Sequence, residues 1–212
     1  MKKAFTLIEI VFVIVIIGIL AVVIIPRTER DPLREAAIQI VSDIRYTQHL
    51  AMIDDKYDST DSNWYRNRWQ LLFGKSSTGT KNTGGKYAYT IFSDYLSTSQ
   101  GNPEPAEMAV NPVDRNKLLS GGYSGGLDWE DDRATKKLNI GYSYGIDNIT
   151  KVGCGAMRIA FDNLGRPFKG DDSSWDDSTE NILKNQCIFT LYSGNETISI
   201  YIEPETGYVH LQ

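Results

Sequence analysis

The chain has 212 residues, of which 41% are hydrophobic, 11% aromatic and 23% charged. This is the composition of a globular protein, and it excludes wholesale disorder, collagen-like and low-complexity architectures. The net charge of −5, from 22 Lys and Arg against 27 Asp and Glu, argues against nucleic acid as a partner, because phosphate contacts need clustered cations. Two cysteines are too few for a disulfide-built scaffold or a four-thiolate zinc site, and two histidines leave little material for metal or acid–base chemistry.

The first feature along the chain is an apolar run. Residues 10–25 carry no charged or polar side chain, and counted from Phe5 the segment spans 21 residues interrupted only by Thr6 and Glu9. A helix of this length is about 31 Å long, which matches a hydrocarbon core of ~30 Å. The run therefore predicts a single transmembrane helix over residues 5–25. A secretory signal peptide that is removed on export is the alternative.

Charges around the run predict its orientation. Lys2 and Lys3 precede it, and by the positive-inside rule they place the N-terminus in the cytoplasm and the chain after about Arg27 on the other side. Glu9 is unusual, because a carboxylate deep in a membrane costs about 2.5–3.5 kcal/mol. Either this side chain reaches the headgroups, or a cation from another chain pairs with it, since the span itself contains none.

Residues 2–9 read KKAFTLIE, and together with the apolar run they resemble the class III signal peptide of type IV pilins and pseudopilins. The resemblance implies that prepilin peptidase cuts between Ala4 and Phe5 and methylates the new amino group of Phe5. Residues 1–4 would then be a cytoplasmic leader peptide. Ala4 is a small residue that stands where the family prefers glycine.

The same resemblance assigns roles to residues within the run. It implies that the apolar helix over residues 5–25 is first a membrane anchor and then the filament core. Glu9 would pair with the amino terminus of a neighbouring subunit during assembly, which supplies the missing cation. Gly18 and Pro26 match positions where family helices carry helix-weakening residues.

Beyond the run, the sequence predicts an amphipathic helix. Asp31-Pro32 is a favourable helix start, because Asp caps a helix and Pro fits its first turn. Apolar residues then recur at spacings of three and four to about Ile53, so residues 26–53 are expected to form the periplasmic half of one long helix packed on a sheet. A helix on a membrane surface is the alternative, although its polar face is mixed in sign. The predicted buried face comprises Leu33, Ala37, Ile40, Val41, Ile44, Gln48 and Ala51.

Residues 54–212 change to short β-rich segments separated by polar loops, and they predict a globular head. Turns are expected at residues 162–167, 193–196 and 204–207. The expected fold class is α+β, a long N-terminal helix packed on an antiparallel β-sheet head. The predicted strands are Trp69–Phe73, Lys86–Phe92, Leu138–Tyr144, Met157–Phe161, Cys187–Tyr192, Thr197–Ile202 and Tyr208–Leu211.

A second resemblance lies in the C-terminal region. Residues 160–167 read AFDNLGRP and residues 200–209 read IYIEPETGYV, which is similar to the end of H-type minor pseudopilins of type II secretion and of FimT-like minor pilins. The resemblance implies strand–turn units of a β-sandwich head and a minor rather than a major subunit. The long insertion at residues 93–137 lies outside it.

Cys154 and Cys187 both lie beside predicted strands in the exported part. In an oxidising periplasm we expect a disulfide that closes a loop of about 34 residues and contributes on the order of 3–4 kcal/mol. Two buried free thiols are the alternative.

Two acidic clusters raise the possibility of calcium binding, since oxygen-rich loops bind this ion. Neither cluster has EF-hand spacing, so solvated loops are the preferred interpretation. Trp129 and Trp175 lie within these loops, where an exposed aromatic side chain could anchor a partner. The clusters are Asp128, Glu130, Asp131 and Asp132, and Asp171, Asp172, Asp176, Asp177 and Glu180.

The sequence thus predicts a pilin-like structural subunit rather than an enzyme, since it has no phosphate-binding glycine loop, nucleophile elbow or metal-binding histidine pair. We expect a single-pass protein of the bacterial inner membrane with its head in the periplasm and no required cofactor. The expected partners are prepilin peptidase, other pilin-like subunits, an inner-membrane assembly platform and lipid. The alternatives are a minor pilin or competence pseudopilin whose head binds DNA or a surface, and an ordinary anchored periplasmic protein.

Overall fold

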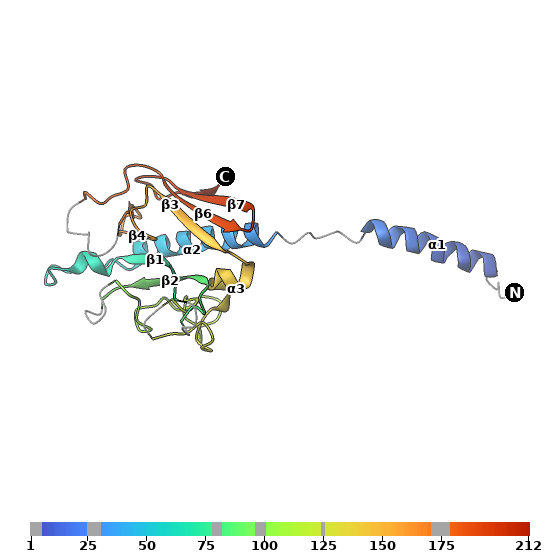
Figure 1. Ribbon diagram of the computed structural model, residues 1–212, viewed down its shortest axis with the longest axis horizontal. Coiled ribbons are helices and arrows are strands. Elements are labelled where there is room, and N and C mark those ends of the chain that lie inside the picture. The colour runs from blue at the N-terminus through green and yellow to red at the C-terminus, as the bar shows by residue number, and fades with distance from the viewer. Residues whose placement is uncertain (1–5, 25–30, 78–81, 96–100, 124–125, 171–178) are drawn as a thin grey trace. The chain divides into compact units, whose positions relative to one another are not determined.

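The computed structural model describes residues 6–24, 31–77, 82–95, 101–123, 126–170 and 179–212. It comprises two units, Met1–Asp31 and Pro32–Gln212 (Figure 1). Several predicted sites therefore lie outside the described residues: Ala4, Phe5, Pro26, Trp175, Asp171, Asp172, Asp176 and Asp177.

The first unit contains the helix α1 (Leu7–Ile24). Its sequence is apolar on all sides, and the apolar side chains described from Leu7 to Leu20 are exposed. Within the described part of the chain, no helix combines the length and the apolar character that crossing a membrane requires.

The second helix, α2 (Pro32–Ile53), belongs to the other unit. The single long helix predicted across residues 5–53 is therefore not seen, and Asp31 is not helical. The physical reason is Pro32, because a proline disfavours helical geometry in the residue before it and fits the first turn of a new helix. The amphipathic prediction itself is confirmed, with one buried face made of Leu33, Ala36, Ala37, Ile40, Val41, Ile44, Thr47 and Ala51.

Two antiparallel sheets surround the buried face of α2. The first has the order β2-β1-β4-β5, with β1 (Trp69–Lys75), β2 (Tyr87–Ser93), β4 (Arg158–Phe161) and β5 (Pro167–Phe168). The second has the order β3-β6-β7-β8, with β3 (Asn148–Val152), β6 (Cys187–Ser193), β7 (Glu196–Ile202) and β8 (Val209–Leu211). The short helix η1 (Trp64–Asn67) lies between α2 and β1, and η2 (Lys136–Leu138) and α3 (Ile140–Tyr144) lie between β2 and β3.

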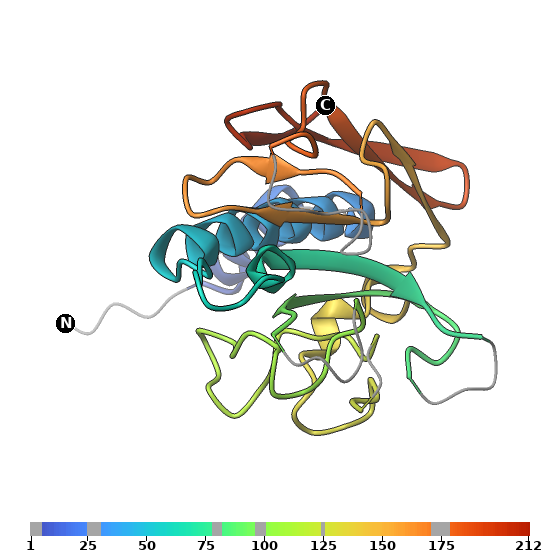
Figure 2. The same cartoon turned by 90° about the vertical axis from the view of Figure 1, so that its left-hand side faces the viewer.

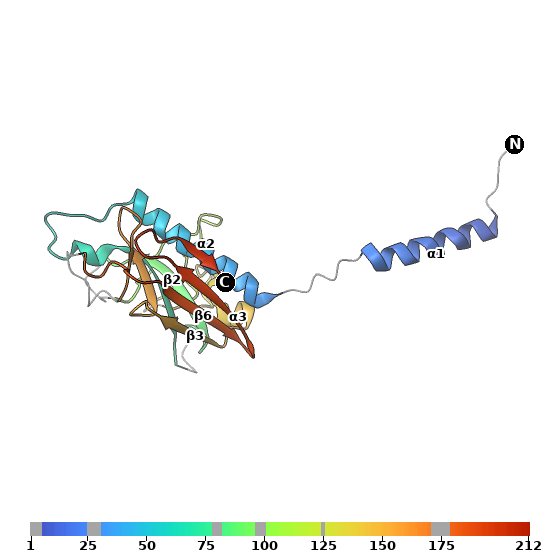
Figure 3. The same cartoon turned by 90° about the horizontal axis from the view of Figure 1, so that it is seen from above.

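The sheets and α2 share one hydrophobic core. Figure 2 shows the red strands of the second sheet on one side of α2 and β1 and β2 on the other. Seen from above, β3 and β6 overlie β2 (Figure 3). Side chains join the two sheets directly, since the rings of Phe73 on β1 and Phe189 on β6 have centroids 5.0 Å apart. The α+β class with antiparallel sheets is thus as predicted.

One predicted strand is wrong and two strands were missed. Residues 138–144 are helical rather than extended, because the Asn139 side chain accepts a hydrogen bond from the Tyr142 backbone and so caps α3. The same side chain donates to the backbone oxygens of Thr83 and Gly121, which fixes the cap in the fold. The missed strands are β3, a mostly exposed edge strand, and the two-residue β5.

The insertion, which the sequence left unassigned, packs against the first sheet. Isolated bridges pair Thr90 with Ser120 and Phe92 with Met108, and Phe92 and Met108 share a small second core with Leu127. Figure 2 places these green segments beyond β2, on the side away from the second sheet. The insertion therefore covers the outer face of one sheet.

Candidate interaction surfaces

The predicted assembly residue Glu9 lies in the first turn of α1 and is exposed. Its Oε2 atom accepts hydrogen bonds from the backbone nitrogen and the hydroxyl group of Thr6, both at 3.0 Å. This reciprocal contact resembles a capping box, in which a side chain three residues into a helix satisfies the backbone before it. Gly18 lies on the same helix, and apart from its chain neighbours and the adjacent helix backbone no described atom lies within 4 Å of the position that a Cβ would take.

The predicted disulfide is confirmed. Cys154 and Cys187 are bonded, with Cα atoms 4.7 Å apart, and both residues are fully buried. The bond joins the loop between β3 and β4 to the start of β6. It therefore links the connection between the two sheets to the centre of the second sheet.

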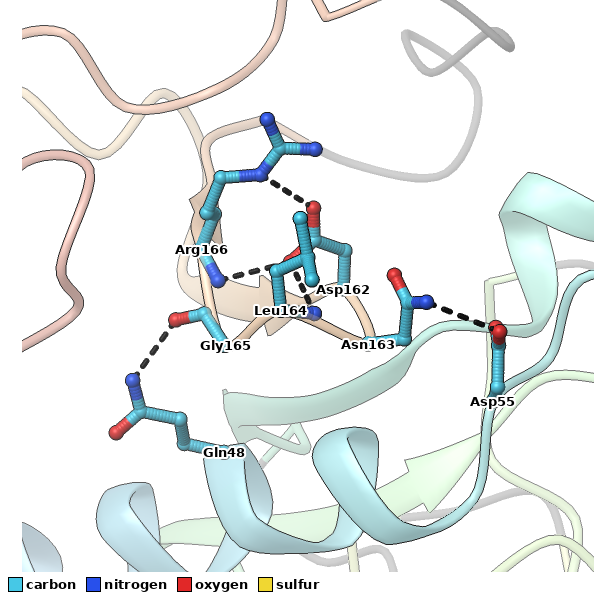
Figure 4. A network of polar contacts seen from close by, with 7 residues as sticks. All are labelled: Gln48, Asp55, Asp162, Asn163, Leu164, Gly165 and Arg166. Carbon is cyan, nitrogen blue, oxygen red and sulfur yellow. Dashed lines mark hydrogen bonds and ion pairs between the residues drawn. The ribbon is translucent and has the colours of Figure 1, made fainter.

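The predicted turn at residues 162–167 is confirmed, and Asp162 organises it (Figure 4). One oxygen of Asp162 accepts from the backbone nitrogens of Leu164 and Arg166, at 3.1 and 2.8 Å. The other pairs with Nε of Arg166 at 2.8 Å. The carboxylate thus accepts hydrogen bonds from the backbone N–H groups of the turn and pairs with Arg166. Local structure alone therefore accounts for the presence of Asp162 and Arg166 in this segment.

Gln48 of α2 connects this turn to the predicted turn at residues 204–207. Its Nε2 atom donates to the backbone oxygens of Gly165 at 2.8 Å and Thr206 at 2.9 Å (Figure 4 shows the first). Two features favour glycine at position 207: a Cβ there would lie 2.7 Å from Nε2 of Gln48, and its φ of +64° is a backbone conformation that other residues rarely adopt. The turns at residues 162–167 and 204–207 therefore meet on one helical side chain.

Replacing Gln48 by Ala is expected to lower the free energy of unfolding by about 1–3 kcal/mol, because two backbone oxygens lose their donor. Chemical denaturation measures the change. The neighbouring exposed His49 supplies the control, since His49→Ala is expected to stay within about 0.5 kcal/mol of the wild type. Equal effects of the two substitutions would contradict the role of Gln48.

A groove of about 730 Å³ runs between the solvent side of α2 and the insertion together with the residues that follow it. Its α2 wall includes Glu35, Ile38 and Asp43, and the opposite wall includes Val113 and Leu138. Ile38 is 52% exposed although it is aliphatic, and Val113 is 94% exposed. A concave and mainly apolar surface with a few polar groups is the usual form of a binding site.

Three polar side chains of the groove, Asp43, Gln39 and Tyr144, are linked in one hydrogen-bonded chain through the buried Tyr89. Tyr89 donates to Asp43 Oδ2 at 2.5 Å, and Tyr144 donates to Gln39 Oε1 at 2.5 Å. Gln39 completes the chain by donating to the Tyr89 hydroxyl at 3.3 Å. Burial raises the pKa of Asp43 above its ordinary value of 3.8, and the bonds from Tyr89 and Gln39 oppose this change only in part.

The raised pKa of Asp43 predicts a pH dependence of stability. The folded chain favours protonated Asp43, so its contribution is fully present below the ordinary pKa of 3.8 and is lost as the pH rises through the raised folded pKa. Asn at this position mimics the neutral acid. The stability of the wild type minus that of Asp43→Asn should therefore fall as the pH rises through the raised folded pKa of Asp43, by about 1.4 kcal/mol for each unit by which this pKa exceeds that of the unfolded chain. A difference in denaturation free energy that grows with pH would contradict this.

A smaller cavity of about 280 Å³ lies at the C-terminal end of α2. Lys56 pairs with Asp54 at 2.6 Å, and Arg166 with Asp162 at 2.8 Å, all four within its walls. Trp69, the first residue of a predicted strand, is half-buried and donates from its indole nitrogen to Asp54 at 2.9 Å. These charges are thus largely satisfied by one another.

The first acidic cluster shows local pairing. Asp131 accepts two hydrogen bonds from the Arg133 guanidinium, which together with the Arg133 backbone nitrogen lowers the pKa of Asp131 to about 2. Across the described ranges, no three His, Cys, Asp or Glu side chains converge as metal ligands would.

Trp129 is half-buried and stacks on Tyr142, with ring centroids 4.2 Å apart.

Sequence reasoning missed the groove. Its two walls come from segments about 75 residues apart in the chain, and only an aliphatic residue on the polar side of α2, Ile38, could have signalled it. Comparisons of the chain with models of protein families, with curated proteins and with solved structures give no match.

Proposed function

We propose that the chain is a pilin-like structural subunit, most similar to a minor pseudopilin, which is cleaved by prepilin peptidase and assembles into a periplasmic pseudopilus or pilus. The observation that carries the proposal is the motif at residues 2–9 followed directly by an apolar run in which Glu9 is the one charged residue. Cleavage before Phe5 would remove the lysines and leave this run at the new N-terminus.

Properties of α1 support an environment of lipid or of neighbouring helices. A helix that is apolar on all sides is normally buried in a membrane or in a large core. The described side chains of α1 are instead exposed within this chain, Leu7 by 82% and Phe12 by 68%. We therefore propose that residues 5–25 first anchor the chain in the inner membrane and then pack against other subunits.

The head and its disulfide fit an exported location. Structural disulfides persist in oxidising compartments such as the bacterial periplasm, and Cys154 and Cys187 are bonded. The head also has a core of its own, made by α2 and both sheets. In the proposed function it is carried outside the inner membrane, where it contacts neighbouring heads, cargo or the assembly machinery.

Substitution of Glu9 tests the assembly step. If Glu9 pairs with the amino terminus of a neighbour, Glu9→Ala should still be cleaved and should remain in the membrane, but should be lost from sheared filaments or cross-linked assemblies by tenfold or more. Glu196→Ala serves as the control, since Glu196 is an exposed glutamate at the start of β7. Equal recovery of Glu9→Ala and wild type in assemblies would contradict the proposal.

A further inference from the structure

The groove beside α2 has an exposed aliphatic projection on its own rim. Val113 lies in the turn at residues 111–116, lines the groove and is 94% exposed. The turn is well fixed, because Asn111 Oδ1 accepts from the backbone nitrogens of Val113 and Asp114, at 2.9 and 3.3 Å. A rigid projection loses little entropy when it is bound. The same face therefore presents both a groove and a side chain suited to fill one.

Charges on this face are also complementary. The α2 wall carries Glu35 and Asp43, whereas the turn that holds Val113 carries the exposed Arg115 two residues later. The ion pairs seen among the described residues involve none of these three side chains. Asp43 is half-buried with only neutral hydrogen-bond partners, Tyr89 and Gln39, so an added cation would favour its charged form.

From this arrangement we infer that the groove is the interface of a homodimer, in which Val113 of each copy enters the groove of the other and Arg115 faces the other copy's Glu35 and Asp43. In a dimer with two-fold symmetry the same surface of both copies forms the interface, so each contact between the two copies occurs twice. The groove thus offers both apolar side chains, such as Ile38 and Val113, and charged ones, such as Glu35 and Asp43, to the second copy.

The inference rests on the head alone. The residues that form the groove and the turn all belong to the unit Pro32–Gln212. It requires neither cleavage before Phe5 nor filament formation, so the homodimer and the proposed function stand or fall separately. A subunit that forms such a dimer would be paired in the membrane before it enters any assembly.

Cysteine cross-linking between two differently tagged full-length chains tests the interface. One chain carries Val113→Cys and the other Ile38→Cys, and the two are mixed in detergent with the native Cys154–Cys187 bond intact. The homodimer predicts an efficient cross-link between the two tags. As control, Val113→Cys is mixed with Lys184→Cys, an exposed position outside the groove. No cross-link between Val113→Cys and Ile38→Cys, or equal yields in both mixtures, would overturn the inference.

Charge exchange tests the pairing. Arg115→Glu in both chains should lower the cross-link yield about tenfold, because like charges then face each other twice. Adding Glu35→Arg to the same chains should restore the yield, and Lys184→Glu should leave it unchanged. Circular dichroism with an intact disulfide verifies that each variant is folded. A cross-link yield that Arg115→Glu leaves unchanged would contradict the proposed contact. So would a folded variant with both Arg115→Glu and Glu35→Arg whose cross-link yield is not restored.

Discussion

Removal of the disulfide by the double substitution Cys154→Ala and Cys187→Ala is expected to lower the free energy of unfolding by about 3–4 kcal/mol. The two residues are 33 positions apart, and a cross-link over a loop of this length removes conformational entropy from the unfolded chain. Alanine is chosen rather than serine because both residues are fully buried, and serine would leave two hydroxyl groups without partners in the core.

Chemical denaturation of the oxidised and reduced proteins measures this effect. Wild-type protein under reducing conditions supplies a matched control, because it keeps both sulfur atoms and loses only the bond. Its stability should fall close to that of the double variant. A double variant that unfolds at the same denaturant concentration as the oxidised wild type would contradict the stabilising role of the bond.

Truncation of Phe73 to Ala is expected to destabilise the head by about 3–5 kcal/mol. The ring of Phe73 is buried, 5.0 Å from the ring of Phe189 and 5.7 Å from that of Tyr89. It therefore fills the space where the two sheets meet, and alanine leaves a cavity that close-packed neighbours cannot refill.

An exposed residue provides the comparison for this truncation. Leu164 is 66% exposed at the tip of the turn after β4, and Leu164→Ala is expected to change stability by no more than about 0.5 kcal/mol. Urea unfolding followed by tryptophan fluorescence measures both variants. If Phe73→Ala cost no more than Leu164→Ala, the two sheets would not share the core described above.

Local patterns predicted much of the head. The alternation of Ile198, Ile200 and Ile202 identified β7, and the residues Ser193 to Glu196 identified its hairpin turn with β6. The apolar spacing after Pro32 located α2 and most of its buried face. These elements are predictable because period and turn chemistry are properties of adjacent residues.

The errors arose where distant residues decide the local structure. In residues 138–144, Leu, Ile, Tyr and Tyr occupy alternate positions, as apolar residues do in a strand. However, the Asn139 side chain donates hydrogen bonds to the backbone oxygens of Thr83 and Gly121, and Asn139 caps the start of a helix. β3 is mostly polar and exposed, so it has no apolar alternation to find. Its pairing with β6 is visible only in the fold.

The groove was beyond sequence reasoning for the same reason. It depends on the insertion, whose packing uses contacts such as that between Phe92 and Met108 rather than regular strands. The buried Arg158 of β4 donates to Gln70 and to the backbone oxygen of Gly101, both at 2.7 Å, and so holds the start of the insertion against the sheet. Such contacts leave no periodic signal.

The central proposal, a subunit processed by prepilin peptidase, is tested most directly by the intact mass and N-terminal sequence of the native protein extracted from membranes. The account predicts a chain that begins at N-methylated Phe5 and lacks residues 1–4. A chain that still begins at Met1 in cells that contain an active prepilin peptidase would contradict it. The protein would then be a simple anchored protein rather than a filament subunit.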